Sequence, residues 1–278
     1  MQTHNHFVAK QKYSCYNYFI KRYKMTNTQI KNVLTQNIIN NMVSLLGQEG
    51  RVFQSEAQFQ FDLAWKIQEY CKDYGCKVFL EVPSPYSTEI TQESIKTSSK
   101  RRFYDIVVLD KHGNFVVIEL KYKILGGTKP FLYKNNQIQL LPQGAGDLGR
   151  CYYLHDIERL EALAKDCSTI TLMNKQFKNF IRGFAIIITN DKNYWEEHGY
   201  NCTSVHKDFC TAHGDKITAG IKKWREGSKE TKSKKVVNIQ GEYECNWMPY
   251  YSEEEYKQCR RIDNPAFMYL TITVEGIK

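Results

Sequence analysis

The sequence lacks any hydrophobic run of the length that a membrane span needs, which is about 20 residues. It also lacks the charged start and apolar stretch that are typical of a secretion signal. We therefore expect a protein without a membrane partner.

Paired cysteines are missing as well. The nine cysteines are odd in number and include no Cys-x-x-Cys pair, whereas disulfide frameworks belong to short secreted chains. We expect reduced thiols and an intracellular, cytoplasmic setting. Cys202, His206, Cys210 and His213 are residue types that bind zinc, but their spacing differs from the usual paired motifs. They would equally form one buried stripe along a helix.

Acidic residues are absent before Glu49, although six lysines and arginines fall in that stretch and the net charge of the chain is +9. A second basic run covers 222–235. Such charge attracts polyanions, and solvated segments would explain it equally well. We divide the chain into a basic N-terminal arm and helix, 1–48, and a larger domain, 49–278.

The remaining composition is that of a globular protein, because 42% of the 278 residues are hydrophobic and 25% are charged. Apolar residues at spacings of three and four predict a helix over 27–46, ended by Gly47. Ser55 is a helix cap by type, and the apolar pattern after it predicts a second helix that ends at Gly75.

Short apolar runs after that helix predict a series of strands. They cover 77–82, 103–109, 115–122 and 182–189, with a helix over 148–164 before the last of them and late strands near 243–251 and 267–274. This order predicts an α/β fold in which helices flank a mixed central β-sheet, with an N-terminal helix and a C-terminal α+β elaboration.

Three polar residues stand at the ends of two of these apolar runs. A three-residue loop over 111–113, with Gly113 in the left-handed position, would place Asp105 opposite Glu119. Side chains alternate along a strand, so Lys121 would share the face of Glu119. A register slip of one residue would separate the cluster.

Two carboxylates this close repel each other unless a cation lies between them. Oxygen ligands favour Mg²⁺ (or Mn²⁺), and an ammonium at Lys121 could orient a water or a phosphate oxygen. A Glu-x-Lys pair on a strand is also a common cross-strand salt bridge, so the pattern alone leaves both interpretations open.

The spacing Asp105, thirteen residues, then Glu119-Leu120-Lys121 resembles the signature of the PD-(D/E)xK nucleases, which have the restriction-endonuclease-like fold. The resemblance covers roughly 55–190. It implies that Asp105, Glu119 and the carbonyl of Leu120 bind the metal, that Lys121 is the catalytic lysine, and that Glu56 is a further carboxylate of the site.

Two departures from the family pattern are present. Tyr104 stands where many members have proline, and the later helix lacks the Gln-x-x-x-Tyr motif of the exonuclease branch. The expected function is a Mg²⁺-dependent nuclease that hydrolyses phosphodiester bonds, with DNA as the expected substrate. The alternative is a binding module for nucleic acid or protein that keeps the fold and does not cleave. The sequence leaves open whether the unit is a homodimer.

Basic residues around the site are candidates for binding the nucleic acid. Lys100, Arg101 and Arg102 precede the Asp105 strand, and Arg150 lies near a glycine-rich helix start that could bind an anion. Asp156 and Arg159, three residues apart on that helix, are expected to form a surface or structural pair rather than a catalytic one.

Overall fold

The computed structural model describes residues 30–85, 102–125, 131–133, 136–140, 146–165, 169–199, 205–226, 236–254, 257 and 266–276. Within these ranges no helix combines the length and the apolar character that crossing a bilayer requires. The basic arm at 1–24 and the polar run at 228–235 lie outside the described residues.

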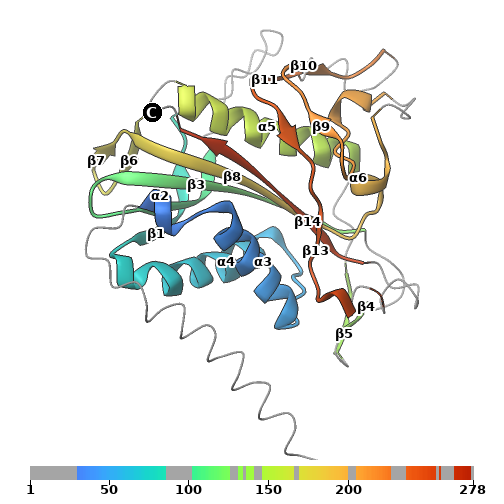
Figure 1. Cartoon of the computed structure of the whole chain (residues 1–278), viewed down its shortest axis with the longest axis horizontal. Helices are drawn as coiled ribbons and strands as arrows, with labels where there is room; N and C mark the ends of the chain where they lie inside the picture. Colours follow the sequence, from blue (N-terminus) through green and yellow to red (C-terminus); the bar gives the residue numbers. More distant parts are fainter. Residues whose placement is uncertain are drawn as a thin grey trace, which may run out of the picture.

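A six-stranded mixed sheet forms the centre of the molecule (Figure 1). Its spatial order is β1 (Lys77–Pro83), β2 (Phe103–Leu109), β3 (Asn114–Lys123), β8 (Asn179–Thr189), β14 (Met268–Glu275) and β13 (Met248–Pro249). β3 and β8 run parallel, and the other neighbours run antiparallel. The prediction of a mixed α/β fold is confirmed.

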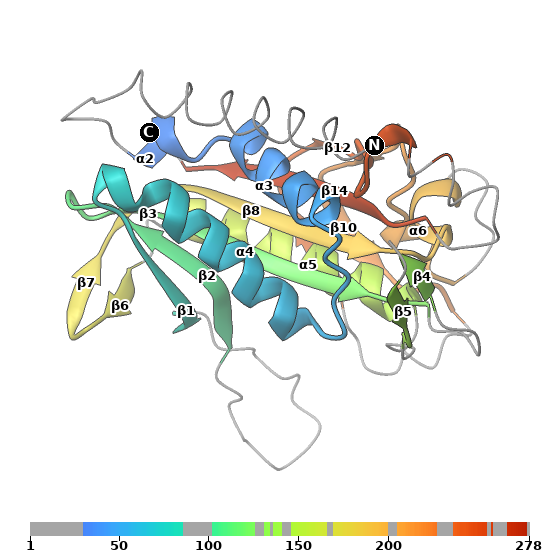
Figure 2. The same ribbon diagram turned by 90° about the horizontal axis from the view of Figure 1, so that it is seen from below.

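Helices cover both faces of this sheet (Figure 2). On one face lie α2 (Ile30–Val33), α3 (Gln36–Gln48) and α4 (Glu56–Cys71), and on the other lies α5 (Gly146–Lys165). Alternation along the strands therefore divides the apolar side chains into two cores, one on each face. In β3, for example, Leu120 and Tyr122 belong to the α4 side, whereas Val117 belongs to the α5 side.

The sequence predicts one continuous N-terminal helix, whereas the structure contains two. α2 ends at Val33, and α3 starts anew with Thr35 as its cap, whose hydroxyl accepts a hydrogen bond from the amide of Ile38 at 3.4 Å. Threonine is favoured at this capping position because its hydroxyl oxygen accepts a hydrogen bond from a backbone amide that lacks a partner within the helix. Residues before Ile30 lie outside the description.

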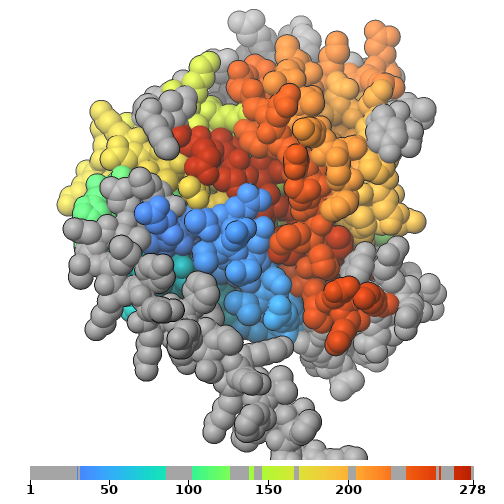
Figure 3. Space-filling view, viewed as in Figure 1, coloured from blue at the N-terminus to red at the C-terminus, as the bar shows by residue number. Residues whose placement is uncertain are grey.

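The N-terminal and C-terminal parts of the chain are in close contact (Figure 3). A Cβ atom on Gly47 would lie 1.7 Å from the carbonyl oxygen of Tyr250, so only glycine allows this approach. The Tyr250 hydroxyl donates to the carbonyl of Arg51 at 2.9 Å. The segment around Tyr250 thus packs against the end of α3, which lies over β14.

α4 agrees with the prediction. Ser55 caps it by accepting a hydrogen bond from the amide of Gln58 at 3.2 Å, and the short helix η1 (Lys72–Tyr74) after it ends at Gly75, whose φ is +71°. Just before the cap, the Tyr122 hydroxyl both accepts from the amide of Phe53 (3.1 Å) and donates to its carbonyl (2.7 Å). This pair of bonds fixes the start of α4 against β3.

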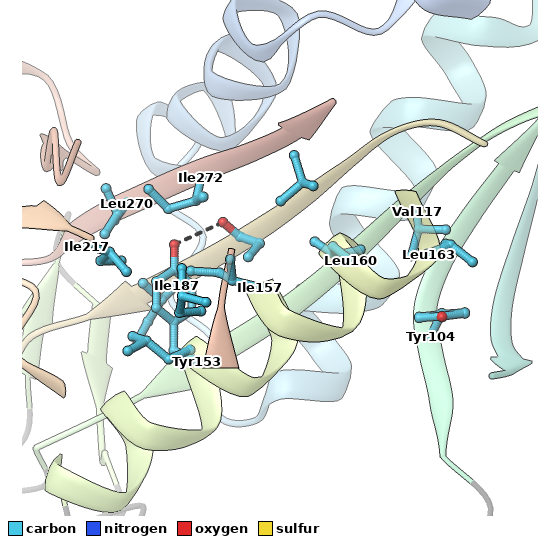
Figure 4. Close-up of a cluster of buried hydrophobic side chains, with 14 of the residues drawn as sticks. Tyr104, Val117, Tyr153, Ile157, Leu160, Leu163, Ile187, Ile217, Leu270 and Ile272 are labelled. Atoms are coloured by element: carbon cyan, nitrogen blue, oxygen red, sulfur yellow. Dashed lines mark hydrogen bonds between the residues drawn. The ribbon is translucent and has the colours of Figure 1, made fainter. Parts of the chain in front are cut away.

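α5 packs its apolar stripe on the other face of the sheet. Figure 4 shows Ile157 and Leu160 of this helix among the strand side chains Ile187 and Ile272. A Cβ atom on Gly183 would lie 2.5 Å from Leu160, so this glycine in β8 lets the helix approach closely. The approach brings the polar flank of α5 over the end of β3.

Shorter elements complete the fold. They are β4 (Phe131–Tyr133), β5 (Asn136–Ile138), β6 (Ile170–Leu172), β7 (Lys175–Phe177), α6 (Asn193–Glu196), η2 (Lys207–Phe209), β9 (Lys216–Ile217), β10 (Gly220–Lys223), β11 (Val236–Ile239) and β12 (Tyr243–Glu244). The C-terminal ones attach to α5 through Glu161, whose carboxylate accepts from the amides of Gln240 and Gly241 and from the hydroxyl of Tyr243.

Replacing Tyr122 tests how firmly α4 is attached. Tyr122→Phe removes one acceptor and one donor and leaves both backbone groups of Phe53 unpaired in a buried place, so we expect a loss of about 1–3 kcal/mol in the free energy of unfolding. Tyr269→Phe is the control, because that hydroxyl donates only to the carbonyl of Asn40 (3.1 Å) and its loss should cost less. Equal losses in urea unfolding would contradict the assigned role.

Candidate active site

The β2–β3 hairpin has the expected three-residue loop. The Asp110 amide donates to the carbonyl of Asn114 at 2.9 Å, and Gly113 has a φ of +85°. The carboxylate of Asp110 holds the turn by accepting from the amides of His112 (2.8 Å) and Asn114 (3.0 Å). The strand pairs run from Leu109 with Phe115 to Ile106 with Ile118, and the same register puts Asp105 opposite Glu119. The predicted register is confirmed.

Glu119 and Lys121 share one face of β3, as alternation predicted. That face is covered by α5, since Glu119 contacts Arg159 and Lys121 contacts Asp156, both of this helix. Leu120 between them belongs to the opposite core. The two charged side chains are buried under a helix and do not lie on an exposed strand face.

Asp105 departs from strict alternation. Tyr104 packs in the same core as Val107, three residues away, whereas Ile106 packs in the opposite core, so alternation in β2 is broken at Asp105. Pairing of β2 with β3 ends at Ile106, and beyond it the Asp105 carboxylate accepts the amide of Leu120 at 2.6 Å. The carboxylate therefore lies in the gap between the two strands, in place of a backbone acceptor.

The helix carboxylate expected from α4 reaches the same place. Glu56 accepts a hydrogen bond from the amide of Tyr122 at 2.9 Å, directly after Lys121. Gln60, one turn later on α4, donates to the carbonyl of Asp105 and to the carboxylate of Glu81, both at 2.7 Å. Sequence analysis missed Gln60; its spacing of four from Glu56 puts both on one face of α4 and was the available signal.

Asp156 and Arg159 form the structural pair that was one predicted alternative, whereas the surface alternative is wrong, because the pair is buried beside Glu119 and Lys121. Their side chains are 8% and 12% exposed. Asp156 lies 2.7 Å from the ammonium of Lys121, and Arg159 lies 3.1 Å from Glu119. Both residues flank the apolar stripe of α5, so the packing of that stripe carries them over β3. The periodicity of the helix indicated the stripe but not which strand residues it would meet.

Arg159 has further contacts that fix its place. Its guanidinium donates to the carbonyl of Phe103 at 2.8 Å, lies 3.6 Å from Asp156, and lies over the Tyr104 ring at 4.9 Å. Guanidinium groups stack favourably on aromatic rings. Together with Glu119, four groups therefore surround this one side chain.

Burial and mutual repulsion change the acidity of the carboxylates. Burial is the main cause that raises the pKa of Asp105 to about 7, against the opposing charge of Lys121. Burial and then Asp156 raise the pKa of Glu119 well above its usual range, while Arg159 opposes them. Burial alone would lower the pKa of Lys121, but the surrounding carboxylates, Asp156 foremost, raise it.

Oxygen atoms in this cluster fit a divalent cation. The Oε1 atom of Glu119 is buried and makes no hydrogen bond, although a guanidinium nitrogen of Arg159 lies 3.1 Å from it. Asp105 supplies a second carboxylate, and the carbonyl of Leu120, which now accepts from the Lys121 ammonium at 2.9 Å, supplies a third oxygen. Mg²⁺ commonly takes one or two carboxylates and keeps several waters. No ready-made cluster of three acidic, histidine or cysteine side chains exists among the described residues.

The candidate residues for nucleic-acid binding have different outcomes. Lys100 and Arg101 lie outside the described residues. Arg102 is half-buried beside the site, where burial and then Arg159 lower its pKa. Arg150 was expected to offer its charge to an anion, but it is buried and donates to the carbonyl of Asn193 and the carboxylate of Glu197, both at 3.0 Å.

The cysteine–histidine group does not form the single helical stripe that its spacing allowed. η2 has three residues and ends before Cys210. His206 contacts Glu197 at 3.2 Å, while His213 accepts from the amide of Trp247 at 3.1 Å. Cys202 lies outside the described part of the chain.

The raised pKa of Asp105 predicts a pH dependence of stability. In metal-free buffer the folded protein holds a proton that the unfolded chain releases near pH 4, so stability should fall as the pH rises from about 4 through about 7. Asp105→Asn keeps an acceptor for the amide of Leu120 and removes this titration. Chemical denaturation between pH 4.5 and pH 8 should therefore show a flatter profile for the variant. Parallel profiles would mean that Asp105 is already ionised at pH 4.5.

Comparisons with known proteins identify no relative of this chain. No family model, no curated protein and no solved structure matches the chain. The proposed function therefore depends on the geometry and charges of the site alone.

Proposed function

We propose that this protein is a metal-dependent nuclease of the PD-(D/E)xK type, with DNA as its substrate. The carrying observation is the register of β2 and β3, which beyond its last pair, Ile106 with Ile118, sets Asp105 opposite Glu119, with Lys121 on the same face of β3 as Glu119. The order of α4, the β1–β2–β3 meander, α5 and β8, with β8 parallel to β3, supports a restriction-endonuclease-like fold.

Asp105, Glu119 and the carbonyl of Leu120 would hold Mg²⁺ or Mn²⁺. A bound divalent cation would supply the Lewis acidity that activates water and stabilises negative charge on the phosphate. In the hydrolysis a water oxygen forms a bond to phosphorus and one phosphorus–oxygen bond of the backbone breaks. The proton that the water loses is balanced by the proton that the leaving oxygen gains.

Lys121 would orient the phosphate or the water through its ammonium group. The carboxylates around it keep it charged, so its contribution is electrostatic. Glu56 sits beside it and holds the amide of Tyr122, which fixes the backbone on the far side of Lys121. Its role in this proposal is to position β3 and to add negative charge to the cation site.

A binding module without cleavage is the second candidate. The observation that favours it is that Glu119 and Lys121 are each paired with an α5 residue of opposite charge. If these ion pairs persist with metal present, the site cannot act on a phosphodiester.

Two buried glutamates separate these candidates. Glu119→Gln should abolish metal-dependent cleavage of plasmid and single-stranded DNA and weaken Mn²⁺ binding at least tenfold, because it removes one charged ligand. Glu161→Gln is the matched control, since Glu161 is also buried but holds the C-terminal segment instead. It should lose stability and keep cleavage. Cleavage by Glu119→Gln at the wild-type rate would exclude the proposed site.

Nucleic-acid binding should depend on the basic arm. Deleting 1–24 removes five of its lysines and arginines, so the slope of log affinity against log salt should become shallower. Fluorescence anisotropy with labelled DNA at several salt concentrations measures this slope. An unchanged slope would show that the arm contacts no phosphates.

A further inference from the structure

Arg159 is placed to do more than neutralise Glu119. Its guanidinium lies 3.1 Å from the buried Oε1 of Glu119, yet that oxygen makes no hydrogen bond. The two groups therefore form an ion pair in which this oxygen still lacks a hydrogen-bond donor. A divalent cation at Glu119 would provide the same compensation at shorter range.

Other contacts hold Arg159 in the site without Glu119. The carbonyl of Phe103, the carboxylate of Asp156 and the ring of Tyr104 surround the guanidinium. Its Nε–H is buried and has no acceptor within the described residues. The side chain would therefore stay in the cluster with a free donor when a metal replaces it at Glu119.

The charges of the cluster favour an anion once the metal is bound. A bound metal ion favours the ionised form of all four carboxylates (Asp105, Glu119, Asp156 and Glu56), and these face three cations (Lys121, Arg159 and Arg102), so the protein groups then carry one net negative charge. One divalent cation reverses that sign. A phosphodiester then restores neutrality, and a guanidinium binds phosphate oxygens in a fixed fork.

We propose that Arg159 is a substrate-binding residue, which holds a non-bridging oxygen of the phosphodiester after a metal ion has replaced it at Glu119. This assignment rests on the proposed nuclease function. It makes Arg159 a competitor of the metal in the free protein and a partner of the phosphate in the complex.

Arg159→Met tests both halves of the assignment. The variant should bind Mn²⁺ at least as tightly as the wild type at pH 8, because a competing cation is gone. It should cleave plasmid and single-stranded DNA at least tenfold more slowly in single turnover, because a phosphate contact is gone. Arg159→Lys keeps a positive charge without the fork, so it should bind Mn²⁺ like the wild type and recover part of the rate.

Arg182→Met is the matched control. Arg182 is similarly buried, donates to the carbonyl of Leu34 at 3.2 Å and pairs with Glu275 at 3.2 Å. Its contacts are with the opposite core, so the variant should lose stability and keep both Mn²⁺ affinity and cleavage.

The possible results distinguish a wrong assignment of Arg159 from a wrong proposal of nuclease function. Cleavage by Arg159→Met at the wild-type rate, or a tenfold loss of its Mn²⁺ affinity, overturns the assignment and leaves the nuclease function intact. If Arg159→Met does not fold, Arg159→Lys decides by the same two measurements. A wild-type protein that neither binds Mn²⁺ nor cleaves DNA removes the nuclease function, and this assignment falls with it.

Discussion

Repulsion among buried carboxylates is the constraint on which the rest of this structure depends. Asp105, Glu119 and Asp156 come from three different elements, and the charge of Asp156 raises the pKa of both Asp105 and Glu119. Burying such charges without partners costs far more than a typical domain can spare. Lys121 and Arg159 therefore stabilise the folded state as well as being candidates for chemistry.

The scaffold around this cluster is built to hold it still. The hairpin fixes the register of β2 and β3, and α4 holds both strands through Glu56 and Gln60. α5 closes the other side because its apolar stripe packs tightly over β8. Because two helices and two strands already hold these side chains in place, binding of a metal ion or a phosphate would cost little conformational entropy.

The same arrangement explains why the ion pairs and the proposed chemistry are compatible. A strong pair in a dry interior is hard to exchange, but the Glu119 oxygen that lies 3.1 Å from Arg159 makes no hydrogen bond. A metal ion, with twice the charge and a closer approach, is a better partner for the same oxygen.

The local pattern of the chain determined the elements and half of the site. Alternation in β3 and the loop at Gly113 were enough to predict the register of β2 with β3 and to put Lys121 beside Glu119, since both depend on neighbouring residues. The irregularity of β2 at Asp105 and the meeting of Asp156 and Arg159 with β3 depend on contacts between distant segments. Only the tertiary structure decided them, because the position of α5 on the sheet depends on packing such as that of Leu160 over Gly183, and not on the helix's own sequence alone.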